Sequence, residues 1–226
     1  MIELKKLPPV MSKVAAFPRV TAGPPPAAIT RINSILAGAD ARVRRAATDC
    51  VRMGKKPSDS DWSRKIAVTM QGPRYLSLVA SDDFYCAGAA HPNTSTVALV
   101  FDLNKGMLVD WVKLLPDLVQ RAGTEEAGDG STLGTVSSNR LSDLYRDLAK
   151  RGGGDPECID ALKETEMNFI LWPDAKQDGL VVEPDLIHAI AACGPPRTIP
   201  LEILRSLGVD AEFLKAVAAA HQQGGV

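Results

Sequence analysis

The chain has 226 residues, of which 45% are hydrophobic and 23% are charged, an ordinary composition for a globular protein with a buried core. Its 26 basic and 27 acidic residues give a formal net charge of −1. A balance this close to zero argues against a dedicated nucleic-acid-binding protein, which usually carries a basic face. The sequence contains no run of about 18 apolar residues, so it predicts no membrane span.

The first nine residues lack the apolar region and the small-residue cleavage site of a secretory leader. Two compartments therefore stay open: a cytoplasmic protein, or a mature periplasmic or extracellular protein whose leader is absent from this chain. We expect one α+β domain over residues 1–226, with residues 1–9 and 222–226 as flexible tails.

The N-terminal half predicts an edge strand, a long helix and an antiparallel meander. Residues 10–20 are apolar and contain a proline near their end, as expected of an edge strand. Isoleucine, leucine and valine then recur at helical spacing, which predicts a helix from Pro26 to about Cys50. The meander strands are expected at residues 62–70, 75–81 and 94–103.

The C-terminal half alternates amphipathic segments with short apolar runs. Residues 123–134 are rich in glycine and resemble an exposed loop, and residues 186–193 fit either a strand or a helix. The pattern predicts an α+β fold whose mixed, mainly antiparallel sheet packs against the long N-terminal helix, followed by a helical C-terminal half. Helices are expected at residues 138–150, 156–163, 201–207 and 210–221, and strands at 167–172, 180–182 and 198–199.

The four cysteines bear on the compartment. Cys50, Cys86, Cys158 and Cys193 form no C-x-x-C pair, and their spacings of 36, 72 and 35 residues match no compact zinc module. An even number fits two disulfides in an oxidising compartment. Four free thiols in a cytosolic protein are the alternative, and these residues alone leave all three pairings open. We expect no cofactor and no metal site.

His91 is the principal candidate for function. It follows the small residues 87–90 and precedes Pro92, which favours an extended backbone at His91. An imidazole suits acid–base chemistry, but a structural role for His91 is the main alternative. The common hydrolase motifs are absent, so we predict no catalytic residues. The candidates for ligand binding are His91, Asn93, Tyr85 and Asp102.

The order of several short motifs resembles a known family. These motifs are Phe17-Pro18, the turn at residues 86–93, Phe101-Asp102-Leu103 before Lys105-Gly106, residues 179–182, and Ile199-Pro200-Leu201. Together they resemble the extracytoplasmic α/β domain shared by the lysozyme-sensing anti-sigma factor RsiV and PdaC-type peptidoglycan deacetylases. In that family a Gly-Gly-Ala-His turn precedes a Phe-Asp-Leu strand, whereas the turn here reads Ala-Gly-Ala-Ala-His.

The resemblance covers residues 10–207 and implies a location in the cell envelope. It also implies disulfides between Cys50 and Cys86 and between Cys158 and Cys193. We therefore expect a non-enzymatic bacterial envelope module that binds peptidoglycan, a lysozyme or another wall-acting enzyme. Two alternatives stay open: an immunity or inhibitor protein acting through residues 123–134, and a cell-wall hydrolase that uses His91 with a nearby acid.

Overall fold

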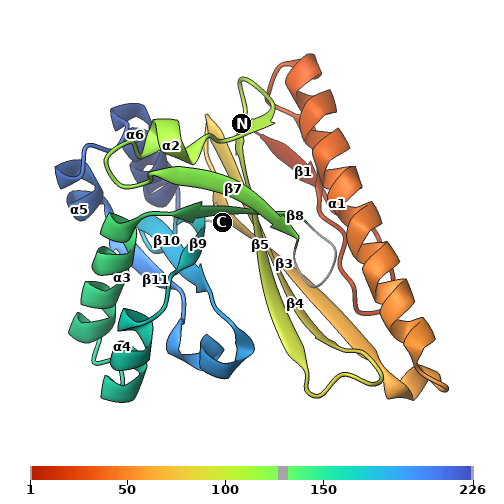
Figure 1. The fold of residues 1–226 in the computed structure, drawn as a ribbon. Helices are drawn as coiled ribbons and strands as arrows, with labels where there is room; N and C mark the ends of the chain where they lie inside the picture. The colour runs from red at the N-terminus through yellow and green to blue at the C-terminus, as the bar shows by residue number, and fades with distance from the viewer. Residues whose placement is uncertain (1, 127–131, 225–226) are drawn as a thin grey trace.

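The computed structural model describes residues 2–126 and 132–224, and this part of the chain has an α+β fold with three antiparallel sheets (Figure 1). The first sheet pairs β1 (Glu3–Lys5) with β2 (Arg19–Ala22). A four-stranded sheet has the order β3-β4-β5-β6, and a five-stranded sheet has the order β11-β10-β9-β8-β7. The predicted α+β class is confirmed, but the single mixed sheet is divided into these three.

The long N-terminal helix is confirmed as α1 (Pro26–Met53). Pro26 occupies the first turn, where its missing N–H has no intrahelical partner to lose. One face of α1 is fully buried at Ile32, Leu36 and Val43, and the helix runs along one face of the four-stranded sheet (Figure 1). Burial of this apolar stripe, rather than helix propensity alone, stabilises the helix.

The predicted meander is confirmed as β3 (Asp61–Gln71), β4 (Tyr75–Tyr85) and β5 (Asn93–Asp102). β3 matches its prediction to within one residue at each end, whereas β4 continues four residues past its predicted end. In this extension Asp82 is buried and Phe84 is half-buried, while Asp83 and Tyr85 on the opposite face are exposed, so the strand continues after its apolar run ends.

The two large sheets are joined where β3 carries a bulge. The register with β4 shifts between Val68 and Met70, which leaves Thr69 outside the regular pairing. The Thr69 carbonyl accepts a hydrogen bond from the Ala175 N–H (2.8 Å), and its hydroxyl donates to the Pro173 carbonyl (3.0 Å). The bulge thus supplies backbone hydrogen bonds to the end of β9 (Asn168–Asp174), which packs against the meander.

The C-terminal half contains both helices and the five-stranded sheet, so it is less helical than predicted. Its hydrophobic side chains belong to the same continuous core as those of the meander. The remaining elements are β6 (Met107–Leu108), α2 (Trp111–Leu114), β7 (Arg121–Glu126), β8 (Thr132–Ser137), α3 (Asn139–Arg151), α4 (Pro156–Lys163), β10 (Gly179–Asp185), η2 (His188–Cys193), β11 (Arg197–Pro200), α5 (Leu201–Ser206) and α6 (Ala211–Gln222), together with the single turn η1 (Pro57–Asp59).

Three sequence-based expectations require correction. Residues 10–18 form no regular strand, because only isolated bridges involve Met11 and Val14, and the strand β2 begins only at Arg19. Residues 1–9 are not simply a tail, since β1 pairs with β2 and Ile2 is buried. The expected loop at residues 123–134 consists largely of the paired strands β7 and β8, and residues 127–131 lie outside the described part. Of the expected C-terminal tail, residues 225–226 also lie outside it.

A buried ion pair lies between the meander and α1. Arg64 and Asp82 are directly opposite each other on β3 and β4, and their side chains are 1% and 0% exposed. The Arg64 Nε donates to both Asp82 oxygens (2.8 and 3.0 Å), and the Trp62 indole N–H donates to Oδ1 (2.9 Å). Removing one member of such a pair leaves the other charge buried without its partner.

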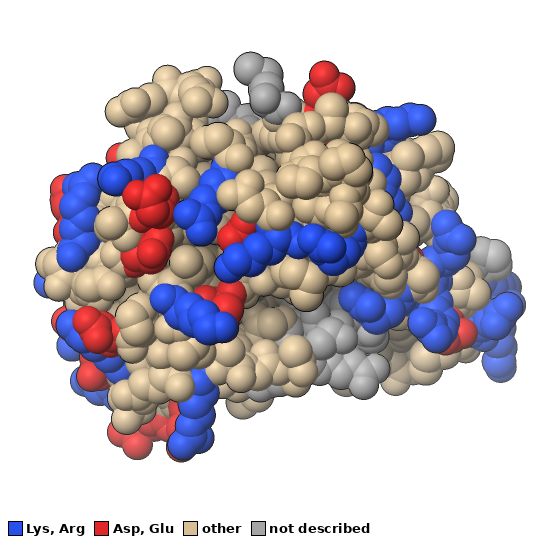
Figure 2. Space-filling view, turned by 90° about the horizontal axis from the view of Figure 1, so that it is seen from above, with Lys and Arg blue, Asp and Glu red and all other residues tan. Residues whose placement is uncertain are grey.

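The exposed charges contribute much less to stability. Seen from above, Lys and Arg side chains lie beside Asp and Glu over the left part of the face (Figure 2). Several exposed pairs are one helical turn apart, such as Lys113–Asp110 and Lys215–Glu212 (both 2.9 Å). Pairs of this kind stabilise a protein by about 0.5 kcal/mol or less. None of the described helices is long and apolar enough to cross a membrane.

We predict that Asp82→Asn lowers the free energy of unfolding by about 3–5 kcal/mol, because the buried Arg64 guanidinium loses its counter-charge. The control is Asp83→Asn, at the exposed neighbouring position, which should change stability by about 0.5 kcal/mol or less. Urea unfolding of both variants measures the difference. If Asp82→Asn and Asp83→Asn unfold with the same free energy, the buried ion pair does not stabilise this end of the meander.

Candidate functional site

Two loops from different sheets meet at a pair of histidine rings. His91 lies in the β4–β5 connection, and His188 begins η2 in the β10–β11 connection. Their rings are parallel, with centroids 3.6 Å apart and an interplanar angle of 9°. We call the surface formed by residues 85–93 and 186–193, together with the C-terminal turn of α1, the histidine end.

The first loop is a short, locally constrained turn. The Ala89 N–H donates to the Cys86 carbonyl (2.9 Å), and Gly88 has a φ of 90°, which a residue with a side chain rarely adopts. The His91 Nδ1 lies 3.0 Å from the Pro92 carbonyl oxygen. If Nδ1 carries the proton and donates to this oxygen, Nε2 remains as the acceptor on the outer side of the ring.

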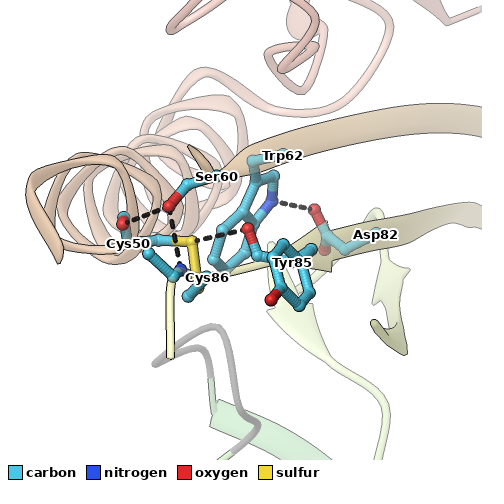
Figure 3. The surroundings of a disulfide bond; sticks show 7 residues. Cys50, Ser60, Trp62, Asp82, Tyr85 and Cys86 are labelled. Carbon is cyan, nitrogen blue, oxygen red and sulfur yellow. Dashed lines mark hydrogen bonds between the residues drawn. A yellow bond between two sulfur atoms is a disulfide. The ribbon is translucent and has the colours of Figure 1, made fainter. Parts of the chain in front are cut away.

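A disulfide and a serine tie this loop to α1. The bond between Cys50 and Cys86 confirms the first predicted pairing. Ser60, which is buried, donates its hydroxyl hydrogen to the Cys50 carbonyl and accepts from the Ala87 N–H, both at 3.0 Å (Figure 3). The Tyr85 carbonyl lies 3.5 Å from the Cys50 sulfur, a contact rather than a hydrogen bond because a disulfide sulfur carries no proton.

The second loop is anchored to α3 and α4. The bond between Cys158 and Cys193 confirms the second predicted pairing and joins α4 to the end of η2. The Tyr145 hydroxyl donates to the Pro195 carbonyl (2.7 Å). Burial raises the pKa of Tyr145 and outweighs the opposing effect of Arg197, so the hydroxyl keeps the proton that it donates. The segment 186–193, which fitted either a strand or a helix, is a 3₁₀ helix.

Three of the four predicted ligand-binding residues lie together. Tyr85 ends β4, Asn93 begins β5, and His91 lies in the turn between them. Asp102 is at the other end of β5, nine residues and therefore about 30 Å from Asn93. Its carboxylate accepts from the N–H groups of Asn104 (3.0 Å) and Lys105 (3.3 Å), so it holds the β5–β6 turn and belongs to no common site with His91.

His188 was not selected from the sequence, although a signal for it was present. His91 is five residues after one disulfide cysteine, and His188 is five residues before another. Each histidine therefore lies within one short loop of a covalent anchor. Sequence spacing could not show that the two loops would meet, because they belong to different sheets.

A carboxyl group links the two sheets near the same end. Glu183 on β10 accepts a hydrogen bond from the Thr96 hydroxyl on β5 (3.0 Å). Burial raises the pKa of the Glu183 carboxyl, the hydrogen bond from Thr96 opposes this shift, and the charge of Asp185 adds to it. Glu183 is partly buried, so it supports the packing of the sheets more than it presents a charge to a ligand.

Two chemical features were sought around the two histidine rings: a carboxylate partner and a metal-binding group. Among residues 2–126 and 132–224, neither imidazole is hydrogen-bonded to a carboxylate that could orient it as a general base. Within the same residues there is also no group of three or more His, Cys, Asp or Glu side chains that could hold a metal ion.

Exposed apolar side chains gather at this end. The exposed large hydrophobic residues in the described part are Met53, Tyr85, Met107, Leu108 and Ile187. Met53 is the last residue of α1, one turn after Cys50, while Tyr85 precedes Cys86 and Ile187 precedes His188. Three of the five thus belong to the segments that form the histidine end, and Ile187 is the most exposed at 72%. Clusters of this kind commonly mark interaction surfaces.

The comparisons with known proteins give little further information. No protein-family model matches this chain, and no curated protein is similar to it in sequence. Among solved structures, a member of the DUF3298 family from Bacteroides fragilis matches with a TM-score of 0.46 and 14% identity, over 87% of this chain and 74% of that protein. This likeness is too distant to carry an argument, and the resemblance to the RsiV/PdaC-type domain stays a prediction.

We predict that a mild reductant opens Cys158–Cys193 before Cys50–Cys86. An attacking thiolate must reach a sulfur atom. Of the first bond only Cys86 is partly exposed, since Cys50 is 3% exposed, whereas both cysteines of the second bond are partly exposed. Brief reduction, alkylation and peptide mass spectrometry would identify the first labelled pair, and full reduction in urea is the control for complete labelling. Earlier labelling of Cys50 and Cys86 would contradict the prediction.

We predict that Glu183→Gln increases the free energy of unfolding relative to the native chain. The increase should grow as the pH rises above about 4.3, the ordinary pKa of a glutamate carboxyl. The folded-state pKa is raised, so the folded protein binds the proton more tightly than the unfolded chain does. The native chain therefore loses the stability that comes from this bound proton as the pH rises through the folded-state pKa of Glu183. Urea unfolding at several pH values measures the difference. A pH-independent difference, or the same profile for the exposed control Glu164→Gln, would contradict it.

Proposed function

We propose that this chain is a non-enzymatic binding module of the bacterial cell envelope and that the histidine end contacts a protein partner. The observation that carries the proposal is the gathering of Met53, Tyr85 and Ile187 around two loops that are each covalently anchored. Anchored loops lose little conformational entropy on binding, so more of the contact energy appears as affinity.

The disulfides also support the proposed compartment. Two bonds in a chain without a free cysteine among its described residues are typical of an oxidising environment, such as the periplasm or the cell exterior. In the chain-entropy model each bond, closing a loop of about 36 residues, stabilises the fold by about 3–4 kcal/mol. A reducing cytoplasm would remove this contribution.

A protein partner is favoured over a glycan. Saccharide sites usually present aromatic rings as stacking surfaces, but Trp62, Trp111 and Trp172 are each at most 9% exposed, and Tyr85 is the one exposed Tyr, Trp or Phe side chain that the histidine end offers. Exposed methionine, tyrosine and isoleucine beside paired imidazoles match the composition of protein interfaces more closely. Within the envelope, a lysozyme or another wall-acting enzyme is the partner class that we propose, with peptidoglycan fragments as the second ligand class to test.

We predict that Ile187→Asp weakens partner binding by about tenfold or more, because a charge then replaces an exposed apolar contact. The matched control is Leu108→Asp, which changes an exposed apolar residue beyond the far end of β5 and should leave affinity unchanged. Calorimetry against a panel of lysozymes, wall amidases and soluble muropeptides measures both variants. Failure to bind any member of the panel, or equal losses in the two variants, would contradict the proposal.

A further inference from the structure

The histidine pair directly links the two loops of the histidine end. The rings of His91 and His188 have centroids 3.6 Å apart and planes within 9° of parallel. Within the part of the chain that the structure describes, no hydrogen bond or ion pair joins residues 85–93 to residues 186–193. The contact between the loops therefore depends directly on the state of these two rings.

Both imidazoles can exchange protons with solvent, because His188 is exposed and His91 is half-buried. A histidine side chain ordinarily gains its charge between pH 8 and pH 5, so mild acid makes such a ring positive. The Pro92 carbonyl oxygen, 3.0 Å from the His91 Nδ1, can accept the proton on this nitrogen whether the ring is neutral or charged. Protonation therefore acts on the stack and not on this hydrogen bond.

Two charged rings in this stack repel each other, which neutral rings do not. Two unit charges about 4 Å apart disfavour the contact about fivefold even with the dielectric constant of water. The factor is larger near a protein surface, where the effective dielectric constant is lower. One charged ring beside one neutral ring has no such penalty, because a cation is attracted to an aromatic face. The stack is thus opposed only when both rings are charged.

The surrounding charges do not offset this repulsion. Asp83 and Asp185 are exposed, so solvent screens their attraction for the rings, whereas the rings are in direct contact. Burial raises the pKa of Glu183, so this carboxyl loses its negative charge more readily than an ordinary glutamate as the pH falls. The ionisable side chains on the elements that adjoin the two loops are Asp82 and Asp83 on β4, Asp61 and Arg64 on β3, Glu183 and Asp185 on β10, Asp49, Arg52, Lys55 and Lys56 at and after the end of α1, and Glu157, Asp160 and Lys163 on α4.

The disulfides confine any opening to the tips of the loops. Cys86 is bonded to Cys50 on α1, and Cys193 is bonded to Cys158 on α4. Residues 87–92 and 187–192 are therefore the segments that can separate while the two sheets keep their places.

We propose that the stacked pair His91 and His188 is a pH-sensitive switch, which holds the two loops together at neutral pH and releases them at about pH 5, when both rings are charged. Opening moves Ile187, which precedes His188, and so changes the exposed apolar surface of the histidine end. The proposal concerns the chain alone, so it can fail without the protein-binding role failing, and the reverse also holds.

Nuclear Overhauser effects between the ring protons of His91 and His188 test the switch in the native oxidised chain at about pH 7.5 and about pH 5. We expect cross-peaks between the rings at the higher pH and cross-peaks about fivefold weaker, or none, at the lower. The amide resonances of residues 87–92 and 187–192 should shift together. Cross-peaks of unchanged intensity at about pH 5 would overturn the proposal, and this measurement needs no substitution.

Two variants identify the group that operates the switch. His188→Phe keeps an aromatic ring but allows only one charge, so contact with the His91 ring should persist at about pH 5. Acid opening of this variant equal to that of the native chain would overturn the proposal. Glu183→Gln imitates the protonated carboxyl and should keep the rings stacked at about pH 7.5. Open loops in that variant would assign the switch to Glu183 instead.

The control is His221→Gln, because His221 is the third histidine and lies on α6, with its Nδ1 2.7 Å from the Ala175 carbonyl oxygen. This substitution should leave the pH dependence of the cross-peaks between the two stacked rings unchanged. Loss of the pH dependence in this control would overturn the proposal, since the switch would then depend on a histidine outside the stack.

Discussion

The meeting of two covalently anchored loops is the constraint on which the histidine end depends. His91 and His188 belong to different sheets, and the stack between their rings is a small contact. The two disulfides position the rings: the Cys50–Cys86 bond attaches the first loop to α1, and the Cys158–Cys193 bond attaches the second loop to α4. The sheets are fixed relative to each other by the shared core and by the hydrogen bonds of Thr69. These anchors fix the segments that carry the exposed apolar residues of the histidine end.

Much of the fold could be predicted because its elements have strong local patterns. α1 was located by its apolar stripe and by Pro26, and the meander by alternating and continuous apolar runs. The way in which the two large sheets are joined could not be predicted, since it depends on one bulge at Thr69 and on contacts between segments about 100 residues apart. The β7–β8 hairpin was missed because glycine and threonine at residues 123–134 carry the composition of a loop.

The candidate site was only partly predictable. Small residues around His91 indicated a tight turn, and the resemblance gave both disulfide pairings correctly. Asp102 was misplaced because two residues close in sequence are far apart when a straight strand separates them. The place of His188 beside His91 depends on which loops the tertiary fold brings together. The spacing of apolar residues within one strand or helix does not show which distant loops meet in the folded protein.

The most direct test of the central claim is the backbone order of the two loops, measured by ¹⁵N relaxation in the oxidised protein. If the disulfides pre-organise one surface, residues 87–91 and 187–191 should have order parameters near 0.85, the value of a rigid backbone. Replacing either cysteine pair by alanine should lower the values in both loops, because each supports the other through the histidine stack. Order parameters below about 0.6 in the intact oxidised protein would contradict the account.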